Sequence, residues 1–399
     1  MSKEKKIELA DPKNSFTRPE TGSVIVISLI IALRLLGIFL MLPIFSAYAV
    51  RYPGATLPLA GLAFGIYALF QSLFQIPMGW ASDRWGRKPL LILGLSIFTV
   101  GSLGCGLAQD VAQLIIARAI QGSGAVGSVA VAALADSTRS NVRAQAFTIT
   151  GIAIGAAFML GLLAGPVLAA HMGLSGLFYI LAVLGALAVV TAALFFPNIE
   201  RWQQQELTNG PWKTLHDTEL RSIYLAGFFL SFALNLFFFT YPLSWTNLGV
   251  EKSQLWEIYL IIFIPSLLVV FPYVRFAEKH GRLQPLVRVG WVSMAGGLFA
   301  YLIGTTQEWL LYVSGAILFL GYSLFQPLLS SFLTERTPQE GRGAATGLYG
   351  FAGFLGSALG GMMGGVLGHF GPSPAVAAGL ILMLVWVLLG LPNPPDPPA

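Results

Sequence analysis

Charged residues are scarce in this chain. Only 10% of its 399 residues are Asp, Glu, Lys or Arg, whereas 55% are hydrophobic. Soluble domains carry about 25% charged residues, so this composition excludes an ordinary soluble fold. A backbone in hydrocarbon must satisfy its own polar groups, which leaves α-helices or a closed β-barrel. The apolar runs are continuous rather than alternating, so we expect an all-α membrane protein.

Cysteine and histidine are also sparse, which removes several classes of site. The one cysteine, Cys105, lies inside an apolar run, so we expect no disulfide. The chain has no P-loop, and its four histidines are scattered over different loops and span ends rather than clustered at catalytic spacing: His171, His216, His280 and His369. We therefore expect no enzyme, no cofactor and no metal site. No basic cluster accompanies a soluble segment, so no nucleic-acid partner is expected.

Twelve apolar segments are long enough to cross a hydrocarbon core of about 30 Å. We expect them at residues 22–50, 57–82, 89–108, 110–136, 143–171, 174–196, 220–246, 254–277, 283–305, 308–334, 342–370 and 373–391. The remaining segments are a polar N-terminal tail at 1–20, a linker at 198–219 and a Pro-rich, disordered tail at 392–399. The N-terminal tail has no apolar core before a cleavage site, so it is not predicted to be a signal peptide. Residues 21–197 and 220–391 thus form two bundles of six helices.

Lysine and arginine are distributed unequally between the two sides of these spans. The outer loops hold Arg51 and Lys252 alone. The inner segments hold the basic residues Lys3, Lys5, Lys6, Lys13, Arg18, Arg84, Arg87, Lys88, Arg139, Arg143, Arg201, Lys213, Arg221, Arg275, Lys279, Arg282, Arg288, Arg336 and Arg342. Because cytoplasmic loops of membrane proteins are enriched in Lys and Arg, both termini are predicted to be cytoplasmic.

The two halves of the chain repeat each other. Residues 271–282 align without gaps on residues 76–87, so that Glu278 takes the place of Asp83. A second pair agrees at nearly the same offset: Asp136 and Arg143 match Glu335 and Arg342. Two pseudo-symmetric six-helix bundles inserted in the same sense pack around a site near the bilayer midplane, as in alternating access. The alternative is a coincidence between two basic cytoplasmic loops.

Three sequence motifs resemble those of a known family. Residues 79–90 (GWASDRWGRKPL) match the first cytoplasmic motif of the major facilitator superfamily, and residues 114–125 (LIIARAIQGSGA) match its fourth-helix motif. Residues 161–166 (GLLAGP) match the fifth-helix motif of its drug–proton antiporters, although Ala169 and Ala170 replace the usual trailing glycines. With residues 33–37 and 41–43 (LRLLG, MLP), the chain is most similar to the YajR-like efflux branch. The resemblance covers all twelve spans and implies the major facilitator fold.

The first motif is expected to act as a conformational latch between the two halves. In it, Gly86 permits a tight turn, Gly79 lets a neighbouring helix approach, and the charges form a cluster at the cytoplasmic rim. The resemblance implies that this cluster holds the outward-facing state, through Gly79, Asp83, Arg84, Gly86, Arg87 and Asp136, with Glu278 and Arg282 in the second half. The alternative is that the charges only orient the loop.

Two arginines, Arg34 and Arg118, lie deep in spans where the sequence offers no Asp or Glu. A charge near the bilayer centre is costly, so both should face protein or a cavity. For Arg118, bonding to carbonyls of span one and a role in proton coupling are both open; Arg34 has an anion-binding or a structural role. The resemblance groups Arg118 with Gln121 and Gly122 as the coupling motif, and Gly161, Gly165 and Pro166 as the fifth-helix motif.

Helical spacing suggests which polar and aromatic residues line a solute site. Amides in lipid-buried helices normally turn inward, and residues four apart share a face. The candidates are Arg34, Tyr67, Gln71, Gln75, Asn235, Phe238, Tyr322 and Gln326. Hydrogen bonding between helices is the competing explanation for the amides.

Together these features predict a secondary active transporter of the bacterial inner membrane, multi-pass and monomeric. It would export a small amphipathic, neutral or anionic solute in exchange for protons, with membrane lipid around it. A cationic solute fits less well, because span one carries Arg34 rather than an acid. The alternatives are an uncoupled or importing facilitator of a metabolite, and a transport-dead scaffold or sensor.

Overall fold

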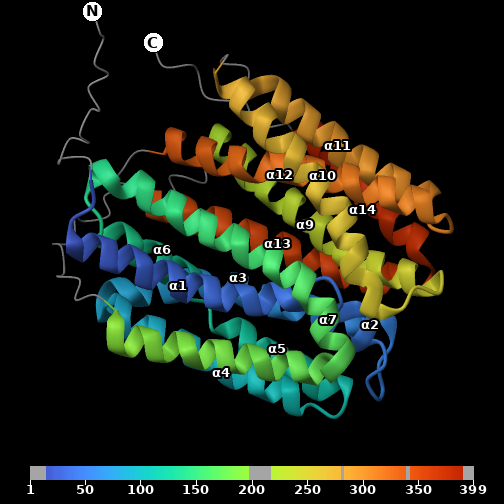
Figure 1. Cartoon of the computed structure of the whole chain (residues 1–399), viewed down its shortest axis with the longest axis horizontal. Helices are drawn as coiled ribbons and strands as arrows, with labels where there is room; N and C mark the ends of the chain where they lie inside the picture. The colour runs from blue at the N-terminus through green and yellow to red at the C-terminus, as the bar shows by residue number, and fades with distance from the viewer. Residues whose placement is uncertain (1–14, 197–216, 280–282, 338–341, 390–399) are drawn as a thin grey trace, which may run out of the picture.

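The computed structural model describes residues 15–196, 217–279, 283–337 and 342–389 (Figure 1). The regular structure in these ranges is helical. The helices are α1 (Arg18–Met41), α2 (Phe45–Ala49), α3 (Leu57–Trp85), α4 (Arg87–Leu107), α5 (Val111–Ser123), α6 (Gly127–Asp136), α7 (Ser140–Phe195), α9 (Thr218–Asn247), α10 (Leu255–Lys279), α11 (Leu283–Ile303), α12 (Glu308–Arg336), α13 (Arg342–Gly368) and α14 (Pro372–Leu389), with a short 3-10 turn η2 (Lys252–Gln254). The expected tails and most of the linker lie outside the described residues.

The helices account for the twelve expected spans. Eleven helical stretches in the part of the chain described are long and apolar enough to cross a membrane, with α5 and α6 together forming one of them. One of these, α7, has 56 residues, about 84 Å of helix, and it holds spans five and six, because the backbone leaves helical geometry at Gly173 (φ 68°, ψ −173°). Glycine takes this left-handed conformation at no steric cost. Span one is interrupted between α1 and α2, and span four between α5 and α6.

Side-chain caps fix where several helices begin. Thr17 and Glu20 form a reciprocal capping box at α1, and the carboxylate of Asp217 accepts backbone N–H bonds at the start of α9. Thr56 and Asp110 cap α3 and α5 in the same way. Caps satisfy N–H groups that have no partner within the helix, so the spans begin at defined residues near the membrane faces.

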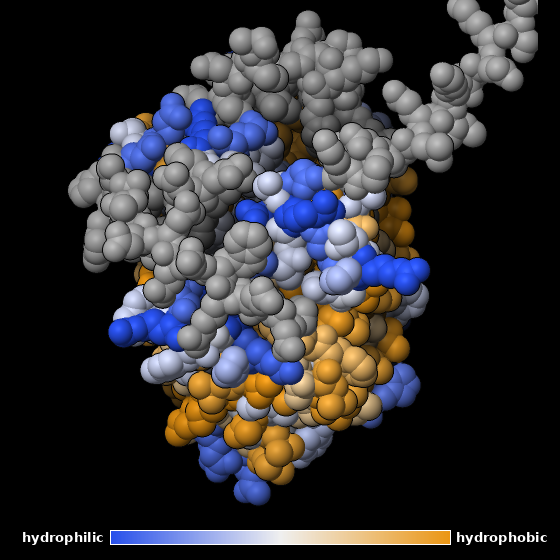
Figure 2. All heavy atoms as spheres, turned by 90° about the vertical axis from the view of Figure 1, so that its left-hand side faces the viewer, coloured by the Kyte–Doolittle hydropathy of each residue, from blue (hydrophilic) through white to orange (hydrophobic). Residues whose placement is uncertain are grey.

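The helices form an N half (α1–α7) and a C half (α9–α14). Within the N half α7 packs on α1 and α4, and within the C half α13 packs on α9 and α11 packs on α12. Figure 1 shows the two halves meeting at the right-hand side, where α2 lies, while the axes of their helices diverge toward the left. Figure 2 views the molecule from that left-hand side. Hydrophilic residues gather on much of the face it shows, as expected of the basic cytoplasmic side.

The outer side is closed by contacts between the halves. The Tyr259 hydroxyl donates to the Pro43 carbonyl at 3.0 Å. The Phe158 and Phe263 rings meet at 5.5 Å, and the Lys252 ammonium lies 4.1 Å from the centre of the Tyr48 ring. Small residues let α3 and α13 touch along most of their length: Gly61 lies against Gly365, and Gly65 against Ala358. Such small-residue contacts are typical of membrane helix interfaces.

Candidate functional site

Arg34 heads a line of polar side chains along α3. Its Nη2 donates to the Gln71 Oε1 atom at 2.6 Å and to the Tyr67 hydroxyl at 3.1 Å. The Gln71 amide then donates to Gln75 at 3.3 Å. Only 4% of Arg34 is exposed, and its buried Nε atom has no hydrogen-bond partner in the described structure. These four residues, all candidates for the solute site, form one connected group.

Arg118 is bonded far more completely than Arg34. Its Nη1 donates to Gln121 at 2.6 Å, and its Nε and Nη2 donate to the Ala63 and Phe64 carbonyls at 3.1 and 3.2 Å. Gln121 in turn donates to the Ser102 hydroxyl at 2.8 Å. The carbonyls belong to α3, the second span, so the expectation of carbonyls from span one is wrong. Span one contributes the Phe45 ring instead, 5.2 Å from the guanidinium.

Tyr67 links the two arginines. Its hydroxyl accepts from Arg34, while its ring lies 4.6 Å from the Arg118 guanidinium in cation–π geometry. Neither arginine forms an ion pair in the described part of the chain. The site thus holds two positive charges without a carboxylate. The Phe98 ring, 5.7 Å from the Arg34 guanidinium, and Ser102 also belong to it; a single sequence gives no sign of either contact.

The polar line reaches the boundary between the halves at its inner end. Ser72 donates to the Phe351 carbonyl of α13 at 3.1 Å, and Gln75 lies against Gly350. The candidates from the C half do not join it through hydrogen bonds in the described residues. Asn235 donates to Ser357 at 3.0 Å. Phe238 lies in an aromatic core between Tyr259 and Phe319. On α12, Tyr322 is half-buried and Gln326 is exposed.

The latch residues of the N half gather around Arg87 at the cytoplasmic rim. Arg87 pairs with Asp83, with Asp136 at 2.8 Å and with the Ser82 hydroxyl at 2.6 Å. Arg84 lies over the Trp80 ring instead, at 4.8 Å. The chain turns at Gly86, whose φ of 96° favours glycine, and Gly79 faces Ser128 of α6. All these contacts stay within the N half. The side chain of Glu278 and the whole of Arg282 lie outside the described residues.

The fourth- and fifth-helix glycines occupy close helix contacts. A Cβ atom on Gly122 would overlap the Tyr67 carbonyl, and one on Gly161 or Gly165 would overlap the α1 backbone at Phe39 and Leu40. Pro166 is buried beside Gly165 in α7. These residues therefore set how closely α5 approaches α3, and α7 approaches α1.

A carboxylate–arginine clasp on the cytoplasmic side was not anticipated from the sequence. The buried Glu20 accepts from the Arg139 Nε and Nη2 atoms at 2.8 and 2.9 Å and from its backbone N–H at 3.0 Å. The pKa of Arg139 is raised by these bonds. The C half repeats the clasp with Glu219 and Arg336 at 3.3 Å. In each half, the acid follows the N-cap of the first helix, and the arginine lies at the end of the fourth span or just after it. A search of the sequence for charges repeated between the halves can find this pattern.

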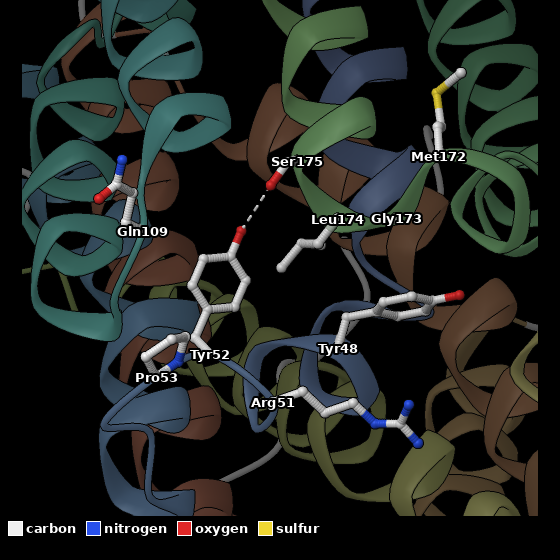
Figure 3. A pocket seen from close by; sticks show the side chains of 9 residues that line it. All are labelled: Tyr48, Arg51, Tyr52, Pro53, Gln109, Met172, Gly173, Leu174 and Ser175. Carbon is white, nitrogen blue, oxygen red and sulfur yellow. Dashed lines mark hydrogen bonds between the residues drawn. The ribbon is translucent and has the colours of Figure 1, made fainter.

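The remaining chemistry is limited. In the described ranges no three His, Cys, Asp or Glu side chains gather as metal ligands. One open pocket of about 290 Å³ lies on the outer side, between the loop after α2, the α4–α5 connection and the Gly173 turn (Figure 3). Burial raises the pKa of Tyr52 in this pocket, so its phenol stays protonated and able to donate.

Comparison with known proteins identifies a family. The sequence matches the model of the Major Facilitator Superfamily over residues 27–243 and 223–399. It is similar to the inner membrane transport protein YajR of Escherichia coli strain K12, with 31% identity over 365 residues that cover 90% of this chain and 80% of YajR. It is also similar to the class B tetracycline resistance protein of Escherichia coli, with 26% identity over 305 residues, 72% of this chain and 73% of that protein.

Solved structures agree on the fold. The human organic anion transporter MFSD10 superposes with a TM-score of 0.69 at 19% identity, over 94% of this chain and 100% of the other. A peptide transporter of the POT family superposes with a TM-score of 0.75 at 13% identity, over 94% of this chain and 99% of the other. At such identities the likeness supports the fold alone.

Proposed function

Because the chain belongs to the Major Facilitator Superfamily and is a multi-pass transporter of the bacterial inner membrane, we propose that it works by alternating access and exports a small amphipathic, neutral or anionic solute in exchange for protons. Export is supported by the resistance to tetracycline in the name of a relative. The latch motif and the small-residue contact of α3 with α13 support two halves that rock against each other.

The proposed class of solute rests mainly on Arg34, whose guanidinium has hydrogen-bond donors without a protein acceptor. Arg118 donates from three nitrogens to protein acceptors, whereas Arg34 donates from Nη2 and keeps a buried, unbonded Nε. An uncompensated charge in a low-dielectric interior is costly, and a carboxylate or a strong dipole on a solute lowers that cost. A cationic solute would be repelled by both arginines.

Proton exchange is the less direct part of the proposal. Antiport needs a group that loads and releases a proton, and no Asp or Glu lies deep in any span. The carriers that remain are Asp136 in the latch, Glu257 near the outer end of α10 and the other acids of the membrane rims. The fifth-helix motif at Gly161–Pro166 supports antiport by resemblance to drug–proton antiporters.

The test is flux in proteoliposomes with and without an imposed pH gradient. We expect the flux of the anionic fluorophore anilinonaphthalene sulfonate and of tetracycline to be faster than that of the cation ethidium. Their flux should rise further when the solution outside the vesicles is acidic. Arg34→Gln should slow the anion about tenfold or more, the loss of roughly 1.4 kcal/mol of charge-assisted binding, and Arg34→Lys should restore part of the rate. Arg221→Gln, at an exposed arginine on the cytoplasmic side of the C half, is the matched control, with less than about threefold change.

Each alternative has its own outcome. An equal rate of flux with and without the pH gradient would indicate an uncoupled facilitator. Flux of ethidium equal to that of the anion, or an Arg34→Gln rate equal to wild type, would overturn the assignment of the solute class. No flux of any probe by folded protein would favour a scaffold or sensor.

A further inference from the structure

Only two basic residues lie in the outer loops of this chain, and the fold brings them to the same place. Arg51 follows α2 in the N half, and Lys252 opens η2 in the C half, 201 positions later in the sequence. The Lys252 ammonium lies 4.1 Å from the centre of the Tyr48 ring, and Tyr48 and Arg51 line the same outer pocket (Figure 3). Arg51 lies in the same turn as Tyr48, where its backbone N–H donates to the Tyr48 carbonyl at 3.0 Å.

No carboxylate neutralises this pair of charges in the described structure. Neither Arg51 nor Lys252 forms an ion pair there. The neighbouring Glu251 accepts a hydrogen bond from Ser253, and the nearby Asp110 caps α5 through Gln113. Two like charges held together across a closing interface oppose that closure. The acids of the outer segments, among them Asp110, Glu251 and Glu308, form no ion pair with either charge in the described structure, so an anion between the two would lower their repulsion.

The pocket beside these cations has the features of a site for an amphipathic anion. Its polar wall is formed by Arg51, Gln109 and a Tyr52 hydroxyl that bonds to Ser175 at 3.2 Å. Its apolar wall is formed by Pro53, Met172 and Leu174. The pocket of about 290 Å³ is open and lies beside the outer ends of the spans. Arginine and lysine are the usual partners of phosphate.

We propose that this outer pocket binds a phosphate-bearing anion, the headgroup of a phospholipid of the outer leaflet, between Arg51 and Lys252. The phosphate bridges the N half and the C half. Because Lys252 reaches Tyr48, which lines the pocket, only while the halves touch, the anion binds the outward-closed state more tightly than the outward-open state. Differential affinity of this kind shifts the balance between two states, so anionic lipid would favour closure of the outer side.

The experiment measures closure in nanodiscs of defined lipid. Spin labels at Ala112→Cys and Thr306→Cys, exposed positions on the outer ends of the N and C halves, report the distance between them by double electron–electron resonance. The buried Cys105 is replaced by alanine. The three conditions are dioleoyl phosphatidylglycerol, a galactolipid without phosphate, and the galactolipid with added inorganic phosphate.

We expect phosphatidylglycerol to raise the ratio of closed to open protein at least about threefold over the galactolipid, the scale of an exposed charge pair. That increase should vanish in Arg51→Gln and in Lys252→Gln and persist in Arg221→Gln, an exposed cation on the cytoplasmic side. An effect of inorganic phosphate alone would support the site with solution phosphate as its occupant. Equal ratios in all three conditions, or an increase that survives both substitutions, would overturn the proposal.

Discussion

The two halves of this transporter share one scaffold but place different chemistry in it. Both begin with a capped helix, both press a glycine-rich fifth helix against their first helix, and both carry a carboxylate–arginine clasp. The N half then buries Arg34 and Arg118, whereas the C half fills the matching space with aromatic rings, including Phe237, Tyr241 and Phe319.

This difference assigns separate tasks to the halves. Aromatic rings in close edge and stacked contacts hold a rigid body, and in the described C half such contacts join Phe237, Tyr241 and Phe319 to their neighbours. The N half instead buries two cations, and the Nε atom of Arg34 has no hydrogen-bond partner in the described structure. We infer that the N half recognises the solute and that the C half moves against it. The predictions below ask where the halves are alike and where they differ.

The largest effect is expected where the halves are alike. A side chain at Gly165 would overlap the Leu40 carbonyl, and one at Gly356 would overlap the Phe228 carbonyl. A backbone carbonyl in a helix cannot rotate away, so Gly165→Leu and Gly356→Leu should each abolish most folded protein; overpacking of this kind costs about 1–3 kcal/mol or more. The monodisperse fraction in fluorescence-detected size-exclusion chromatography measures it.

The matched controls are glycines of the same two helices that face open space. Gly155→Leu and Gly347→Leu place a Cβ atom where nothing lies within 4 Å, so their monodisperse fraction should equal that of wild type. Loss of folded protein in one half alone would show that the two helix contacts are not equivalent.

A smaller effect is expected where the latch differs between the halves. Asp83 pairs with Arg87 within the N half, and Glu278 holds the corresponding position in the sequence of the C half. Asp83→Asn removes one of two carboxylates around Arg87, so transport should fall several-fold while membrane insertion is unchanged; Glu278→Gln should reduce it less. Initial flux normalised to the amount of inserted protein measures both. Full transport by Asp83→Asn would contradict a latch role.

The smallest effect concerns the two clasps. The Glu20 side chain is 8% exposed and accepts three bonds from Arg139, whereas Glu219 is 65% exposed and meets Arg336 at 3.3 Å. Exposed pairs contribute little to stability and buried bonds to charged groups contribute more. Glu20→Gln should therefore lower the melting temperature in detergent by a few degrees, and Glu219→Gln by less. An equal shift in both would mean that burial does not distinguish the clasps.

Much of the fold could be predicted from local patterns. The twelve spans follow from apolar run length, and the helices agree with them, with α7 holding two spans around Gly173. The orientation, which rests on the positions of Lys and Arg, stays a prediction. The breaks near Pro43 and at Gly124–Val126 were not expected. Membrane helices tolerate glycine and proline, so whether a helix breaks at such a residue depends on the helices packed around it.

The site was predicted in part. Spacing along one helix placed Tyr67, Gln71 and Gln75 on one face, and the structure joins them to Arg34. Spacing failed for Phe238, which packs inside the C half, because a helix surrounded by other helices offers several buried faces. For Arg118, one of the two open alternatives was bonding to carbonyls of span one, and the carbonyls that hold it belong to α3 instead.

The sequence by itself determined that this chain spans the membrane and that its halves repeat, and it predicts which way the spans are inserted. Those properties depend on how many apolar residues follow one another and where charges interrupt them, and each segment carries that information alone. The tertiary structure decided which atoms Arg34 and Arg118 reach, that Tyr67 serves both, and that Arg51 and Lys252 meet across the outer face. These contacts depend on how each helix is rotated and how closely its neighbours approach, which is set by packing between segments far apart in the chain.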